Sequence, residues 1–109
     1  MAAGFPYQNP DGQWVVGNGT LRLSMQIALG NFEENLRDRQ YKVHSNTVYI
    51  ARLNRMIQFG DLRAVDVANL EASRLALQQE NQRLRAQMAA IREHIRVVRE
   101  VLQGLANNP

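Results

Sequence analysis

The chain has 109 residues, a net charge of +3, 45% hydrophobic residues and no cysteine. This length allows one domain at most, and the lack of cysteine with only two histidines excludes a disulfide framework and a Cys/His metal site. No apolar run approaches the roughly 20 residues of a membrane span, and the N-terminus lacks the basic and apolar regions of a secretory signal. We therefore expect a cytoplasmic or nuclear protein without cofactors.

Residues 1–19 are rich in helix-breaking residues, among them Pro6, Pro10 and Gly17, which surround one short apolar segment that contains Trp14. Proline and glycine at this density interrupt any helical pattern. We predict a flexible N-terminal arm over residues 1–19.

Residues 20–58 carry a stripe of mostly apolar side chains spaced alternately four and three residues apart. Its members are Met25, Leu29, Phe32, Leu36, Arg39, Val43, Asn46, Ile50, Leu53 and Ile57. This spacing is that of a heptad repeat, in which the stripe forms one face of a helix. The pattern predicts a first coiled-coil helix segment over residues 20–58.

Residues 63–106 carry a second and longer heptad stripe, followed by a tail at 107–109. Its polar members are Arg74 and Asn81, and the expected seam residues are Val67, Leu70, Leu77, Asn81, Leu84, Met88, Ile91, Ile95, Val98, Leu102 and Leu105. Such a stripe requires the matching stripe of another helix, so the sequence predicts a leucine-zipper-like coiled coil.

The seam composition favours two parallel helices. A single Asn at position a with Leu or β-branched residues at d is typical of parallel dimers, because Asn81 pairs with its copy only in register. Glu80 would then face Arg85 of the copy, whereas an antiparallel pairing of two copies would set Arg85, Arg92 and Arg99 against one another. We predict an all-α fold, a long parallel homodimeric coiled coil.

The two stripes are out of phase across residues 59–62. A continuous coiled coil absorbs such a phase shift as a stutter, by local unwinding. Alternatively the helix ends, with Gly60 at its C-terminus and Asp61 as the N-cap of the next helix, which gives a helical hairpin. We favour the continuous rod, because a hairpin turn usually carries more breakers than one glycine.

One segment resembles a known family. The matching residues are Arg52, Leu53, Asn54 and Arg55, followed by Leu70, Glu71, Glu80, Asn81, Leu84, Arg85 and Gln87. This arrangement resembles the N-terminal coiled coil of shugoshins, above all the fungal ones. Shugoshins are homodimers that recruit protein phosphatase 2A through its B′ subunit to protect centromeric cohesin. They also interact with the chromosomal passenger complex.

The resemblance implies a non-enzymatic adaptor of chromosome segregation, located at the centromere in the nucleus. Asn54 would occupy the place of the family's phosphatase-binding asparagine. In either heptad register Asn54 lies outside the seam, so with Arg52 and Arg55 it is the predicted partner-binding centre.

Other classes remain to be weighed. A structural coiled-coil assembly protein of a virus, a phage or the cytoskeleton fits the composition as well. DNA binding by a basic zipper is disfavoured, because residues 45–66 contain only Arg52, Arg55 and Arg63 as basic residues. An enzyme is disfavoured too, since no phosphate-binding glycine loop and no nucleophile with an adjacent base can be identified.

Overall fold

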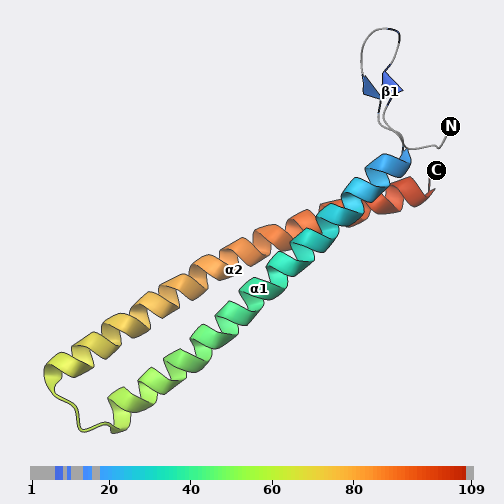
Figure 1. Ribbon diagram of the computed structural model, residues 1–109. Coiled ribbons are helices and arrows are strands. Elements are labelled where there is room, and N and C mark those ends of the chain that lie inside the picture. The colour runs from blue at the N-terminus through green and yellow to red at the C-terminus, as the bar shows by residue number, and fades with distance from the viewer. Residues whose placement is uncertain (1–6, 9, 11–13, 16–17, 108–109) are drawn as a thin grey trace. The chain divides into compact units, whose positions relative to one another are not determined.

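The computed structural model describes residues 7–8, 10, 14–15 and 18–107. The elements follow in the order β1 (Tyr7–Gln8), β2 (Trp14–Val15), α1 (Asn18–Phe59) and α2 (Ala64–Asn107), as Figure 1 shows. The described part of the chain is therefore almost entirely helical, as the heptad stripes predicted.

The two strands form a short antiparallel pair near the N-terminus. Tyr7 lies opposite Val15, and Gln8 lies opposite Trp14. The sequence analysis assigned this region to a flexible arm and did not predict strands. Its other residues up to position 17, apart from Pro10, lie outside the described residues.

The chain divides into two compact units. One unit consists of Leu36–Ala90 and is called the hairpin unit here, and the other combines Met1–Asn35 with Ile91–Pro109 and is called the terminal unit. Each unit contains one stretch of α1 and one stretch of α2. Each is described by itself below.

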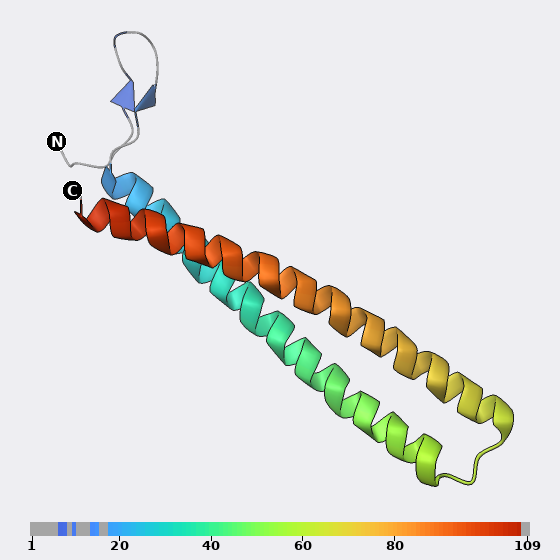
Figure 2. The same cartoon turned by 180° about the vertical axis from the view of Figure 1, so that it is seen from behind.

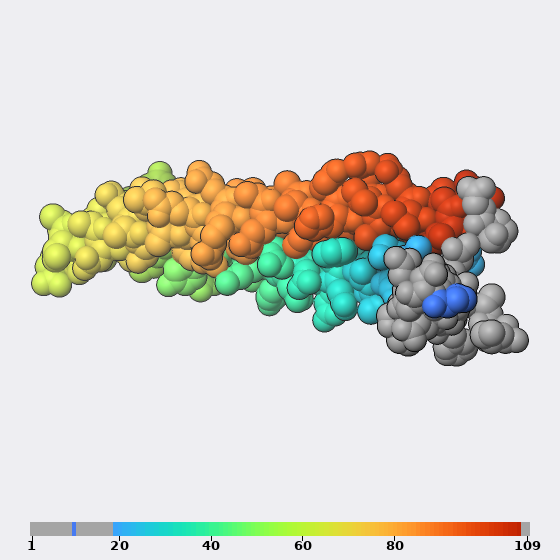
Figure 3. Space-filling model, turned by 90° about the horizontal axis from the view of Figure 1, so that it is seen from above, coloured from blue at the N-terminus to red at the C-terminus, as the bar shows by residue number. Residues whose placement is uncertain are grey.

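In the hairpin unit the two helices run antiparallel, as Figures 1 and 2 both show. Polar contacts across this unit define its antiparallel register, because the residue number of the partner on α2 decreases as the residue number on α1 increases. The contacts are Arg39 with Gln87, Asn46 with Asn81, and Asn54 with Arg74. Leu53, Leu84 and Met88 form the buried core of the unit. From above, the surfaces of the two helical stretches of this unit adjoin each other (Figure 3).

The helix does not continue through Gly60, so the favoured continuous rod is wrong. α1 ends at Phe59, and the amide of Gly60 donates a last hydrogen bond to the Met56 carbonyl at 2.9 Å. A Cβ on residue 60 would come closer to that same carbonyl oxygen than real Cβ atoms do, and would lie 3.0 Å from Leu62 Cγ. Glycine is therefore suited to this turn, because it alone lacks the clashing atom.

The second helix begins later than the sequence suggested. Asp61 was expected as the N-cap, but α2 starts at Ala64. The Arg63 carbonyl accepts the amides of Asp66 and Val67 at 3.0 Å each, and the Arg63 side chain donates to the Asp66 carboxylate at 2.9 Å. A carboxylate in the first turn also interacts favourably with the positive end of the helix dipole.

The terminal unit also packs its two helical stretches against each other. The rings of Phe32 and His94 lie 5.2 Å apart, Arg99 pairs with Glu33 at 3.5 Å, and Arg22 donates to the Leu105 carbonyl at 3.1 Å. Ile95 and Val98 are its buried apolar residues.

Both predicted stripes form the packed faces of their helices. All ten members of the α1 stripe and all members of the α2 stripe are buried or half-buried, while most of their neighbours are exposed. The two stripes pack against each other within each unit, so each helix finds its partner in the same chain. Within the chain Asn81 pairs with Asn46. Its pairing with a second Asn81 in a parallel dimer stays a prediction.

Candidate functional site

A polar layer crosses the seam in the middle of the hairpin unit. Asn46 Nδ2 donates to Asn81 Oδ1 at 3.0 Å, Asn81 Nδ2 donates to Thr47 Oγ1 at 3.4 Å, and Thr47 Oγ1 donates to the Val43 carbonyl at 2.7 Å. Asn81 is only 3% exposed. Among the described residues no buried side-chain nitrogen or oxygen lacks a partner. This layer is therefore a structural element rather than an open binding site, since its hydrogen-bonding groups are occupied.

An ion pair lies beside the polar layer. Lys42 Nζ on α1 is 2.9 Å from Glu80 Oε1 on α2, so this ion pair connects the two helices. The hydrogen bond from Lys42 lowers the pKa of Glu80 below its ordinary value, with a smaller contribution from the charge of Arg83. Glu80 was predicted to face Arg85 of a second chain, and the structure gives it Lys42 of its own chain.

The predicted partner-binding residues lie together near the end of α1. Arg52, Asn54 and Arg55 are all exposed. Asn54 is not free of contacts, because Arg74 Nη1 donates to its Oδ1 at 2.8 Å. A partner that uses the Asn54 carboxamide would therefore have to share or displace Arg74.

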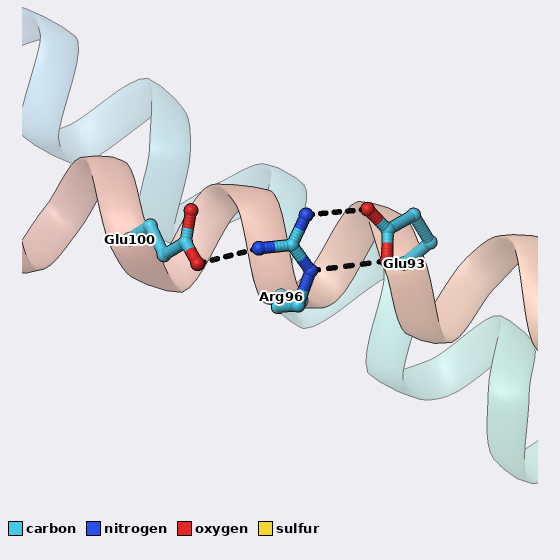
Figure 4. A network of polar contacts seen from close by, with 3 residues as sticks. All are labelled: Glu93, Arg96 and Glu100. Carbon is cyan, nitrogen blue, oxygen red and sulfur yellow. Dashed lines mark hydrogen bonds and ion pairs between the residues drawn. The ribbon is translucent and has the colours of Figure 1, made fainter.

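In the terminal unit, α2 carries a local charge network (Figure 4). Arg96 lies between Glu93, three residues before it, and Glu100, four residues after it, and donates to both carboxylates. The hydrogen bond to Glu93 and the charge of Glu100 raise the pKa of Arg96, and the hydrogen bond from Arg96 lowers the pKa of Glu93. The positive charge of Arg96 is thus neutralised on its own helix.

A group of exposed apolar side chains lies on the face of α1 turned away from the seam in the hairpin unit. Tyr41, Tyr49 and Val48 are 74%, 49% and 46% exposed. Together with His44, Ser45 and Arg52 they line a shallow hollow on the surface. An exposed apolar group of this kind, bordered by polar residues, is typical of a protein-interaction surface.

Sequence analysis missed this outer face, although its signal is present in the chain. The residues Asp38, Tyr41, Ser45, Val48, Arg52 and Arg55 are themselves spaced alternately three and four apart. That is a second heptad spacing, displaced around the helix from the seam. It was overlooked because its ends are charged, and only its centre is apolar.

Among the described residues, no three His, Cys, Asp or Glu residues gather in a way that could hold a metal ion. None of the helices in this part of the chain combines the length and the apolar character that a membrane span needs.

Comparisons with protein-family models, with characterised proteins and with solved structures found no match.

Proposed function

We propose that this chain is a non-enzymatic protein-interaction element. It forms a helical hairpin in which the two apolar stripes pack against each other, and it binds other proteins through the outward faces of its helices. The observation that carries the proposal is the group of exposed apolar side chains on α1, Tyr41, Val48 and Tyr49, which the intramolecular seam leaves uncovered. Because apolar surface of this size is costly in water, it favours coverage by another protein surface.

The closed seam supports this proposal. In a coiled coil the apolar stripe normally provides the dimer interface, but here each stripe is already packed against the other stripe of the same chain. The helices thus form a preformed surface, and a partner need not order a disordered segment on binding. A second copy of the chain is the first partner that we propose, as the following subsection argues.

Recruitment of a phosphatase is the second candidate, and it follows from the shugoshin resemblance. It is favoured by the exposure of Arg52, Asn54 and Arg55 on one end of α1. In this case the hairpin would act as an adaptor that binds the B′ subunit of protein phosphatase 2A. The parallel homodimer through the α2 seam belongs to the same candidate, and it requires the hairpin to open, because its seam residues are otherwise covered by α1.

One double variant separates these candidates. Asn46→Cys with Asn81→Cys places two thiols where the native side chains are hydrogen-bonded, and the chain contains no other cysteine. Oxidation in dilute solution should give an intramolecular disulfide, seen as a monomer of increased mobility on a non-reducing gel. The locked and reduced forms are then compared by light scattering over a range of concentrations, and by a pull-down with purified B′ subunit.

The outcomes differ for each candidate. Self-association of the locked hairpin supports an interaction element that acts through its outward faces. Association of the reduced form alone, together with rapid crosslinking of the single variant Asn81→Cys between chains, would instead establish the parallel seam dimer. If the locked form bound B′ and Asn54→Ile abolished that binding while the exposed-site control Asn31→Ile did not, the adaptor candidate would be supported. A hairpin that stayed monomeric and bound no B′ subunit in either form would refute the proposal.

A further inference from the structure

The outward face of α1 in the hairpin unit has the pattern of a second, unpartnered seam. It comprises Asp38, Tyr41, Ser45, Val48, Arg52 and Arg55, and is called the outer stripe here. All six residues are exposed, and Tyr49 flanks them. Their alternating three- and four-residue spacing keeps them on one face of a helix, which allows a second helix to pack along it.

The charges of the outer stripe are unequally placed. Asp38 lies at its N-terminal end, and Arg52 and Arg55 lie at its C-terminal end, with the apolar side chains between them. If two copies of the stripe met in parallel, Asp38 would face Asp38 and Arg52 would face Arg52. Like charges directly opposite each other destabilise an interface, so a parallel pairing is disfavoured.

An antiparallel pairing of two copies reverses this pattern. Asp38 and Arg52 each lie seven residues from Ser45, and Tyr41 and Tyr49 each lie four residues from it. A two-fold axis at Ser45 therefore sets Asp38 against Arg52 of the copy, each contact occurring twice. Tyr41 meets the flanking Tyr49 of the copy, and Val48 meets the flanking Lys42 of the copy. The small Ser45 side chain at the axis permits close approach of the helices. A surface that complements itself in this way is what a two-fold dimer requires.

We propose that two copies of this chain associate through their outer stripes, with α1 antiparallel to α1 of the copy around a two-fold axis at Ser45. The proposal extends the interaction function proposed above and depends on it. The other classes of occupant, such as an acidic helix bound along Arg52 and Arg55, do not account for Asp38 at the opposite end. A second copy in reverse places an arginine opposite Asp38 and an aspartate opposite Arg52.

A charge exchange tests the pairing. Asp38→Arg alone and Arg52→Asp alone each replace two attractive contacts by two repulsive ones, and each should weaken self-association about tenfold or more. The double variant with Asp38→Arg and Arg52→Asp should restore the wild-type dissociation constant, measured by analytical ultracentrifugation at low salt. Glu71→Arg, an exposed charge change on α2 outside the stripe, is the matched control and should leave association unchanged.

A single thiol tests the axis. Ser45→Cys places two thiols together at the proposed axis and should crosslink two chains under mild oxidation, whereas Ser73→Cys, an exposed serine on α2, should not. Lack of rescue in the double charge variant, or equal crosslinking at both serines, would overturn the outer-stripe dimer. If the locked hairpin still associated in that case, only this inference would fail and the proposed interaction function would stand. A chain that stayed monomeric would overturn the inference, and binding to the B′ subunit would then decide the proposed function.

Discussion

The asparagine layer of the hairpin unit gives the sharpest test of the intramolecular seam. Replacing Asn81 by Leu removes the acceptor of Asn46 and the donor to Thr47 while adding an apolar side chain at a site that is 3% exposed. If the seam is closed within the chain, the cost of this change depends on Asn46, because its amide loses the Asn81 acceptor and keeps a weaker hydrogen bond to the Glu80 carboxylate. If Asn81 instead paired with Asn81 of a second chain, the substitution would replace both side chains of the pair, and no unpaired amide would be left.

The expected magnitude follows from this asymmetry. Leaving a buried polar group unpaired costs about 1 to 3 kcal/mol, while burial of a leucine side chain contributes roughly 1.5 to 3 kcal/mol at most. Asn46 is only half-buried, so water partly satisfies its amide in the variant. The two contributions are of similar size, so Asn81→Leu should change the free energy of unfolding by at most about 1 kcal/mol. Adding Asn46→Leu removes the remaining amide and should raise the free energy of unfolding above the wild-type value, with a coupling of about 1 to 2 kcal/mol between the two sites.

The measurement is a double-mutant cycle by urea unfolding, followed by circular dichroism at one fixed protein concentration, because self-association would make stability concentration-dependent. Asn69→Leu, an exposed asparagine on α2, serves as the control and should change stability little. Additive effects of Asn46→Leu and Asn81→Leu would mean that the two side chains are not in contact.

Three further predictions concern the turn, the core and the ion pair. Gly60→Ala should lower the free energy of unfolding by about 1 to 3 kcal/mol, because its Cβ overlaps the end of α1; an increase in the melting temperature would contradict the hairpin turn. Leu53→Ala, at a 3% exposed site, should cost about 2 to 5 kcal/mol, whereas Leu75→Ala at a 53% exposed site should cost far less in the same urea titration. Because the hydrogen bond from Lys42 lowers the pKa of Glu80, its stabilisation is complete above the ordinary pKa of 4.5 and is lost as the pH falls through the lowered folded value. Glu80→Gln should therefore reduce the acid-induced fall in melting temperature below pH 4.5, and an unchanged profile would show that the Lys42 pair does not persist in solution.

The sequence predicted both seams well because heptad spacing fixes which side chains share a helix face. Even Arg39 and Asn46, polar members of the α1 stripe, lie half-buried in the packed face. The partner of each seam could not be predicted in the same way. The same spacing serves a helix of the same chain and a helix of another chain equally well, so the decision lies in the few residues that connect the two stripes.

The charges of α2 did not predict the hairpin, because they concern only the pairing of α2 with a second α2. In that pairing an antiparallel arrangement sets Arg85, Arg92 and Arg99 against one another. In the structure the antiparallel partner is α1, and Arg99 meets Glu33 instead. The hairpin also explains why the two heptad stripes are out of phase near Gly60, because two helices joined by a turn need no common heptad register along the chain.

For the predicted partner site, the exposure of the residues could be predicted from the local heptad pattern, but their tertiary contacts could not. Heptad position alone placed Arg52, Asn54 and Arg55 outside the seam, and all three are exposed. The contact between Asn54 and Arg74 could not be predicted, because it depends on the pairing of residues 20 apart in sequence across the turn.

The polar members of the seam also explain why the hairpin adopts this register. Asn81 lies opposite Asn46, and a slide of one heptad in either direction would bring it opposite Leu53 or Arg39. Leu53 offers no hydrogen bond, so that slide would leave the Asn81 amide unpaired at a cost of about 1 to 3 kcal/mol. Arg39 would lose its bond to Gln87 and bring a charge against the buried amide. Since the aliphatic members of the two stripes tolerate a slide far better than these pairs do, the polar residues select the intramolecular register, and the apolar residues supply the stability that this register needs.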